Sequence, residues 1–244
     1  MNNQIEILQK YIDEAKHIVF FGGAGVSTES GLPDYRSTEG VYTTMEKKDI
    51  DPKKLMSKRF MLEHPEVFFS RRFRSEAPIK PKPNAAHNYL AALEQSGKSI
   101  HIITQNVDGL HQKAGSTKVI ELHGNNRRFY CMTCGIEYAY KDIQRDEQNV
   151  PRCPLDNGIV RSDVILFGEN LKPEDLVRSK EIISSADLLI IAGTSLTVYP
   201  AKNLINQFNG DKVVVINKDP LEMKLTADLF IKGAVGATFS QLSI

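Results

Sequence analysis

Six short runs of apolar residues recur along the 244-residue chain, and each has the length of a buried strand. Helical patterns separate several of them, and apolar residues from Ile5 to Ala15 recur at helical spacing near the start. Strands that alternate with helices predict an α/β fold: a mostly parallel sheet with helices on both faces. The predicted strands are residues 17–21, 99–104, 118–122, 163–167, 187–193 and 212–217, and the predicted helices include 84–97, 172–186 and 199–210.

Two segments interrupt this alternation and predict inserted parts. Residues 34–83 are rich in charged residues, methionine and phenylalanine, which favours a helical insert with a loop. Residues 125–160 contain all three cysteines and only weak, polar strand patterns, so we expect a small separate module there. The large α/β domain would then comprise residues 1–33, 84–124 and 161–244.

The composition excludes several classes of protein. A formal net charge of +1 gives no electrostatic reason to expect nucleic acid or an anionic membrane as a partner. No apolar run approaches the roughly 20 residues that cross a bilayer, and the mixed charges near the N-terminus are unlike a signal peptide. Three cysteines make a poor disulfide framework. We therefore expect a cytoplasmic protein, and its oligomeric state is unknown.

The sequence FFGGAGVSTESGLPDYRS directly follows the first predicted strand. Gly23 and Gly25 would let the backbone approach a phosphate, and a helix that begins at this turn would supply N–H groups. The Rossmann fingerprint for dinucleotides is only partial, because Thr28 occupies its third glycine position. A tight turn without a ligand is the alternative. Arg36, in the same loop, could pair with a phosphate or a carboxylate.

Polar side chains follow two further predicted strands. Gln105, Asn106 and Asp108 come after the second, and His123 comes after the third. In open α/β sheets, ligands bind at the carboxyl ends of the strands. Asp108 could instead only cap the following helix, and a lone histidine is more often structural than catalytic.

Several motifs, in the same order, resemble those of the sirtuins, the NAD-dependent protein deacylases. They are GAGVSTESGLPDYRS, TQNVDGLHQKAG, VIELHG, ILFGENL, GTSLTVYP and VVVIN, and they extend from about Gly22 to Asn217. The likeness is nearest to bacterial and archaeal members with minimal termini. It implies a Rossmann-like sheet that binds NAD, and acyl-lysine proteins or peptides as substrates. The implied products are deacylated lysine, nicotinamide and O-acyl-ADP-ribose.

The resemblance also implies roles for individual residues. The acyl oxygen would attack C1′ of the ribose as nicotinamide leaves, and His123 would be the base that lets a ribose hydroxyl attack the resulting alkylimidate. Asn106 would position the ribose or a water, Gln105 would hold the ribose and support His123, and Asp108 would line the nicotinamide pocket. The implied cofactor-binding residues are Gly23, Ala24, Gly25, Thr28, Tyr35, Arg36, Gln105, Asn106, Val107, Asp108, His123, Gly193, Thr194, Ser195, Asn217 and Val235.

The substrate is implied to bind along residues 165–171, an open strand edge to which an extended peptide would add as another strand. The implied contacts are Val164, Phe167, Gly168 and Glu169. One departure is Tyr35, which stands where the family usually has phenylalanine. Members that prefer succinyl or malonyl lysine carry Tyr-x-x-Arg in the helical insert, and PEVFFSRRFRS has no such tyrosine. We therefore expect neutral acyl groups, acetyl first.

Three cysteines and one aspartate have the spacing of zinc ligands. Cys131 and Cys134 form a C-x2-C pair, eighteen residues separate Cys134 from Cys153, and Asp156 stands where a fourth cysteine would complete the pattern. The family has a four-cysteine zinc ribbon in this place. Because a carboxylate also binds zinc, we expect a structural zinc held by these four residues. An eroded ribbon without metal is the alternative.

Other functions remain open on the same residues. Mono-ADP-ribosyl transfer and NAD hydrolysis would use the same pocket, and a non-catalytic NAD-sensing module would keep only the fold. The presence of Asn106, Asp108 and His123 favours catalysis. The sequence identifies neither the protein substrates nor the preferred acyl length.

Overall fold

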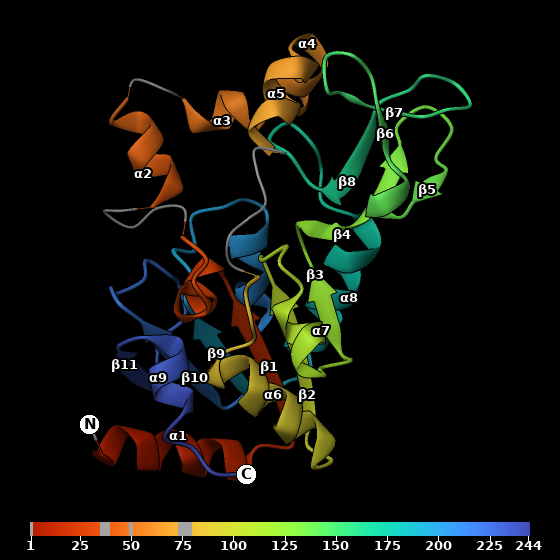
Figure 1. Ribbon diagram of the computed structural model, residues 1–244. Coiled ribbons are helices and arrows are strands. Elements are labelled where there is room, and N and C mark those ends of the chain that lie inside the picture. The colour runs from red at the N-terminus through yellow and green to blue at the C-terminus, as the bar shows by residue number, and fades with distance from the viewer. Residues whose placement is uncertain (1, 35–39, 49–50, 73–79) are drawn as a thin grey trace.

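The computed structural model describes residues 2–34, 40–48, 51–72 and 80–244. Its largest feature is a six-stranded parallel sheet with the order β11-β10-β9-β1-β2-β3 (Figure 1). The strands are β1 (His17–Gly22), β2 (Ser99–Thr104), β3 (Val119–Glu121), β9 (Leu188–Ala192), β10 (Lys212–Asn217) and β11 (Leu229–Lys232). The strand order reverses at β1, with β2 and β3 on one side of it and β9 to β11 on the other.

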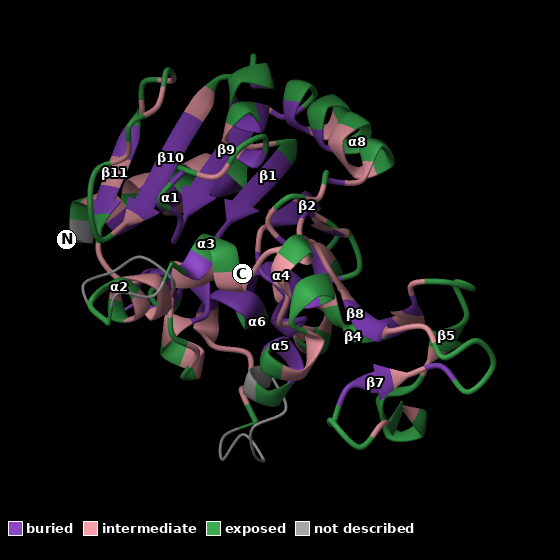
Figure 2. Cartoon of the chain, turned by 90° about the horizontal axis from the view of Figure 1, so that it is seen from above, coloured by how far each residue is buried: buried purple, intermediate pink, exposed green. Residues whose placement is uncertain are grey.

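Helices cover both faces of this sheet, so its strands are buried (Figure 2). Ile18 and Phe20 pack into one apolar cluster with α1, α6 and α9, while Val19 and Phe21 pack into a second with α8 and η4. These helices are α1 (Asn2–Glu14), α6 (Ala85–Gln95), α8 (Pro173–Ser184), α9 (Val235–Phe239) and the 3-10 helix η4 (Ala201–Gln207). Strands buried on both faces are apolar at every position. The predicted α/β fold is confirmed.

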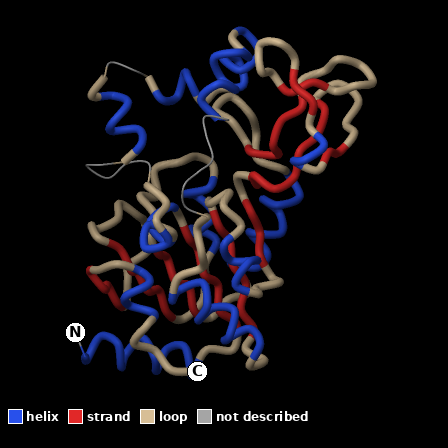
Figure 3. The backbone as a smooth tube through the Cα atoms, viewed as in Figure 1, coloured by secondary structure: helices blue, strands red, loops and turns tan. Residues whose placement is uncertain are grey.

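A second group of elements lies beyond one end of the parallel sheet (Figures 1 and 3). It contains short helices and an antiparallel sheet with the order β5-β4-β8. The helices are α2 (Val41–Glu46), α3 (Pro52–Leu55), α4 (Lys58–Glu63) and α5 (Pro65–Arg72). The strands are β4 (Gly124–Cys131), β5 (Glu137–Tyr138) and β8 (Val160–Val164), with a separate β6 (Gln144–Arg145) and β7 (Pro151–Arg152) pair. The remaining short helices are η1 (Ala24–Val26), η2 (Thr28–Ser30), α7 (Leu110–Ala114) and η3 (Tyr140–Asp142).

Some predicted elements differ from the structure. Residues 163–167 do not form a strand of the parallel sheet, because β8 ends at Val164 and pairs antiparallel with β4. The apolar side chain of Leu166 instead packs against the helical insert. Residues 199–210 contain a 3-10 helix, and β11 and α9 had no sequence prediction. Among the described residues, no helix has the length and apolar character that membrane crossing requires.

Candidate active site

One cavity of about 930 Å³ lies at the carboxyl ends of the parallel strands, a size typical of sites for small molecules. Residues that follow all six parallel strands line it, together with residues of the helical insert and of β8. The predicted site residues in its lining are Gly23, Ala24, Gly25, Thr28, Gln105, Asn106, Val107, His123, Val164, Phe167, Gly168, Glu169, Gly193, Thr194, Ser195, Asn217 and Val235. Asp108 is not in the lining, and Tyr35 and Arg36 lie outside the described residues.

The turns after β1 and β9 touch each other at the bottom of this cavity. The amide of Gly25 donates to the carbonyl of Gly193 at 2.8 Å, and the amide of Gly23 donates to Ala192 at 3.1 Å. A Cβ on Gly25 would lie 2.7 Å from the Cα of Gly193. Glycine is therefore required here for the two backbones to meet. Because β1 and β9 flank the point where the strand order reverses, this contact marks the usual ligand position of such sheets.

His123 is held by a backbone hydrogen bond from the neighbouring strand end. Its Nδ1 lies 3.0 Å from the carbonyl oxygen of Gln105. A carbonyl can only accept, so Nδ1 carries the proton of the neutral ring and Nε2 is the basic nitrogen. The ring is half-buried and lines the cavity. His123 is thus placed to accept a proton from a ligand.

Gln105 connects three strand ends. Its backbone amide donates to the carbonyl of Gly22 at 2.9 Å, and its own carbonyl accepts from Nδ1 of His123. Its side-chain amide donates to Thr194 Oγ1 at 3.0 Å. The support predicted for His123 therefore comes from the backbone of Gln105. The Gln105 side chain instead ties the end of β2 to the turn after β9.

A buried polar network lies behind the cavity wall. Ser27 Oγ donates to Asp108 at 2.8 Å and accepts from the side-chain amide of Asn106 at 3.1 Å. The other Asp108 oxygen accepts from the amide of Leu110 at 2.9 Å, where α7 begins. Asp108 therefore caps a helix and also orients Ser27. Ser27 was not among the predicted site residues, since its position in the glycine turn does not reveal a partner some eighty residues away.

The segment 165–171 differs from the predicted open strand edge. Phe167 forms a single parallel bridge to Ser57, in which its amide donates to Met56 and its carbonyl accepts from Lys58, both at 3.0 Å. Glu169 forms an ion pair with Arg161, a buried residue that also lines the cavity. Arg161 was not among the predicted site residues, because an arginine in a weak polar strand gives no sign of where its side chain lies.

Four candidate metal ligands lie together in the small antiparallel module. The ligand atoms of Cys131, Cys134, Cys153 and Asp156 are all within 4.8 Å of one another. The sulfurs of Cys134 and Cys153 are 3.8 Å apart, and Cys131 Sγ is 3.3 Å from Asp156 Oδ1. Tetrahedral zinc with ordinary bond lengths needs about 3.8 Å between sulfurs and about 3.5 Å between sulfur and oxygen. The donor set therefore fits zinc, and none of the three cysteines forms a disulfide.

Comparisons with known proteins agree with this geometry. A family profile described as the Sir2 family matches residues 23–200. A protein from Clostridium acetobutylicum named NAD-dependent protein deacetylase is 45% identical over 235 residues, which cover 96% of each chain.

Two solved structures are similar over nearly the whole chain. One, described as Sir2 with a p53 peptide and NAD+, has a TM-score of 0.84 and 36% identity, and the match covers 97% of this chain and 95% of that one. The other, described as Sir2 bound to acetylated peptide, has a TM-score of 0.84 and 34% identity, with 97% and 96% covered.

Proposed function

Because the chain belongs to the Sir2 family, we propose that it is an NAD-dependent protein-lysine deacetylase. It transfers the acyl group of an acyl-lysine to ADP-ribose and releases nicotinamide and deacylated lysine. The observation that carries the proposal is the position of His123. Its ring is hydrogen bonded to the Gln105 carbonyl inside the cavity where the glycine turns of β1 and β9 meet. A protein that only sensed NAD would not require a base there.

The cavity lining is suited to hold NAD. When bound, NAD supplies an electrophilic ribose carbon and nicotinamide as a leaving group. Gly23 and Gly25 line the cavity and have no side chain that would keep a phosphate from their backbone, and the hydroxyl groups of Thr194 and Ser195 can donate to its oxygens. Asn217, the last residue of β10, and Val235, the first residue of α9, would contact the adenosine part. Tyr35 and Arg36 are proposed to complete this site.

His123 acts as the general base in this proposal. With Nδ1 donating to the carbonyl of Gln105, Nε2 is the nitrogen that would accept a proton from a ribose hydroxyl when NAD is bound. Asn106 orients the ribose or a water, and its amide is held by Ser27. Asp108 acts indirectly, through its hydrogen bond to Ser27. We assign Asp108 as a positioning residue rather than a contact.

The remaining proposals concern the substrate, the metal and the location. The acyl-lysine enters beside Val164 and the loop from Phe167 to Glu169, which lines the cavity. Zinc bound by the four-ligand cluster described above stabilises a module of residues 125–160, apart from an NAD-binding domain (1–33, 84–124 and 161–244) and a helical insert (34–83). Thiols that serve as ligands suit a reducing compartment, and we propose the cytoplasm.

The test is an acetyl-lysine peptide incubated with NAD and the chain, with products identified by mass spectrometry. We expect deacetylated peptide, nicotinamide and O-acetyl-ADP-ribose in equal amounts. His123→Ala should lower kcat by at least a hundredfold, since the base is removed. His17→Ala, which removes an exposed imidazole outside the cavity, is the matched control and should keep full activity.

The same experiment separates the alternative reactions. Nicotinamide released without peptide indicates NAD hydrolysis, and ADP-ribose bound covalently to protein indicates ADP-ribosyl transfer. NAD binding with none of these products would identify a sensing module. Undiminished deacetylation by His123→Ala would contradict the assigned base.

A further inference from the structure

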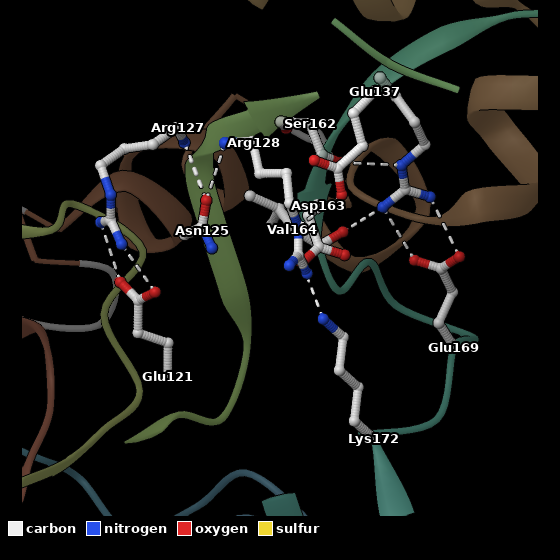
Figure 4. Close-up of polar contacts among 11 residues, drawn as sticks. Glu121, Asn125, Arg127, Arg128, Glu137, Ser162, Asp163, Val164, Glu169 and Lys172 are labelled. Carbon is white, nitrogen blue, oxygen red and sulfur yellow. Dashed lines mark hydrogen bonds and ion pairs between the residues drawn. The ribbon is translucent and has the colours of Figure 1, made fainter. Parts of the chain in front are cut away.

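Arg161 is a buried cation that none of the proposed steps uses. It lies in β8, is 4% exposed, and lines the cavity. Its two terminal nitrogens each lie 3.0 Å from one oxygen of Glu169, so the ion pair is bidentate. Figure 4 shows Glu169 with dashed lines to both of its carboxylate oxygens. Its Nε donates to the carbonyl of Ser162 at 3.1 Å, and one terminal nitrogen also donates to the carbonyl of Val164.

These two carbonyls belong to the open edge of β8. In the sheet order β5-β4-β8, the described residues place a neighbouring strand on only one side of β8. Ile165 donates to His123, and Ile159 accepts from Met132, so the odd-numbered residues face β4. In an antiparallel pair, alternate residues direct their backbone groups to opposite sides. Ser162 and Val164 therefore face outward, and the guanidinium group occupies the edge that they form.

Glu169 extends the same arrangement to the following loop. Its Oε2 accepts from the amide of Leu166 at 2.9 Å, which satisfies the next outward-facing donor of the segment. Its Oε1 lies 3.7 Å from Lys58 Nζ in α4. Lys58 also donates its amide to the carbonyl of Phe167, the residue between Leu166 and Gly168. The loop is thus held between β8 on one side and the helical insert on the other.

We infer that Arg161 positions the substrate peptide by occupying the β8 edge from Ser162 to Leu166 together with Glu169. An extended peptide cannot then pair with that edge as an added strand, and its backbone is left to Gly168 and Glu169, which line the cavity next to that edge. The inference rests on the proposed deacetylase function and adds to it the register of the substrate.

An arginine suits this task better than a lysine. Its planar group donates in several fixed directions, so it reaches two carboxylate oxygens and two carbonyls at once. A lysine supplies the positive charge but has only one nitrogen from which to donate hydrogen bonds. Burying a charged pair costs free energy and is often no more stabilising than apolar packing. We therefore assign the ion pair to occupying the backbone groups at the edge of β8 and not to stabilising the fold.

The experiment compares Arg161→Met, Arg161→Lys and a control, Arg152→Met. Arg152 lies in the separate β6–β7 pair, forms an ion pair with Asp146 at 2.8 Å and is not in the cavity lining. Binding of a fluorescent acetyl-lysine peptide is measured by anisotropy, and KM is measured separately for peptide and for NAD. Melting temperatures establish that each variant is folded.

We expect Arg161→Met to raise the peptide Kd and KM at least tenfold and to leave the KM for NAD within twofold. Arg161→Lys should fall between Met and the wild type, and Arg152→Met should match the wild type.

Unchanged peptide binding by folded Arg161→Met overturns the inference. So does an equal rise in both KM values, which would assign Arg161 a general structural role. If Arg161→Met does not fold, Arg161→Lys decides, because wild-type peptide binding by that variant contradicts the requirement for a forked donor. A wild-type chain that neither binds nor deacetylates the peptide contradicts the proposed function itself.

Discussion

The histidines near the cavity differ in their hydrogen-bond partners. His123 has its Nδ1 bound to the Gln105 carbonyl at 3.0 Å and lines the cavity. His111 is 1% exposed between the rings of Phe20 and His87, and its ring nitrogens have no hydrogen-bond partner among the described residues. Burial lowers the pKa of His111 to about 3 and that of His87 to about 4. Both buried imidazoles are therefore neutral in the folded chain.

This burial predicts a loss of stability in mild acid. An unfolded histidine takes up a proton near pH 6.5, whereas the folded chain does not until about pH 4 for His87 and about 3 for His111. As the pH falls from 6.5, the unfolded state binds more protons, and the free energy of unfolding decreases by about 1.4 kcal/mol per pH unit for each group. Above pH 6.5 this loss is absent. Urea unfolding at pH 7.5 and pH 5 measures it.

The variant His111→Phe isolates one of these two groups. It keeps an aromatic ring against Phe20 and removes a titratable group that has no hydrogen bond to lose. We expect little change in the free energy of unfolding at pH 7.5. Between pH 7.5 and pH 5, the variant should lose about half as much of this free energy as the wild type loses. His17→Phe, at an exposed position, is the control. An acid loss as large as that of the wild type would show that His111 is not responsible.

Hydrophobic periodicity predicted the strands of the parallel sheet but not the pairing of β8 with β4. Runs buried on both faces, such as residues 99–104 and 212–217, were predicted within a residue, because covering helices favour apolar residues on both faces of the strand. The run at 163–167 looks the same in sequence, yet it leaves β8 at Val164 and enters a loop. Which strand a segment pairs with depends on distant residues, so local periodicity cannot distinguish these cases.

Gly124 makes this contact possible and carries a prediction. Its φ is 69°, and a Cβ there would overlap the carbonyl oxygen of Asp163 in β8. Gly124→Ala should therefore cost several kcal/mol of stability and lower kcat, because the preceding His123 must move. Gly135 has a similar φ of 76° with open space around it. Gly135→Ala therefore introduces the backbone strain without the steric overlap, and it should lower the free energy of unfolding by about 1 kcal/mol. Equal losses in urea unfolding would contradict the steric argument.

At the scale of the whole molecule, the cavity is assembled from segments far apart in the chain. Sequence reasoning identified the members that follow strands, such as Gly23, Gln105 and Gly193, since parallel strands bring their carboxyl ends to one edge. It did not identify Arg161 or the Ser27 bond to Asp108, because these depend on side-chain directions across separate elements. The metal cluster was predicted from spacing and family resemblance, and its four ligand atoms do lie together.

The cluster predicts how the molecule responds to loss of metal. Asp156 Oδ1 is oriented by the amide of Gly158 at 2.8 Å and lies beside Cys131. Asp156→Ala removes one of four ligands, so we expect less zinc per purified chain and a lower melting temperature. Asp156→Cys should retain zinc, and Asp142→Ala, an exposed carboxylate of the same module, should behave as the wild type. Elemental analysis gives the ratio, and unchanged zinc in Asp156→Ala would remove Asp156 from the ligand set.

Every thiol of this chain belongs to that one cluster. A maleimide dye consequently has no other thiol to label, and a thiolate coordinated to an ion reacts slowly with the dye. The speed of dye uptake by the purified chain would then report, in real time, what fraction of the molecules has an open cluster. The chain thus carries a built-in reporter of its own metal occupancy.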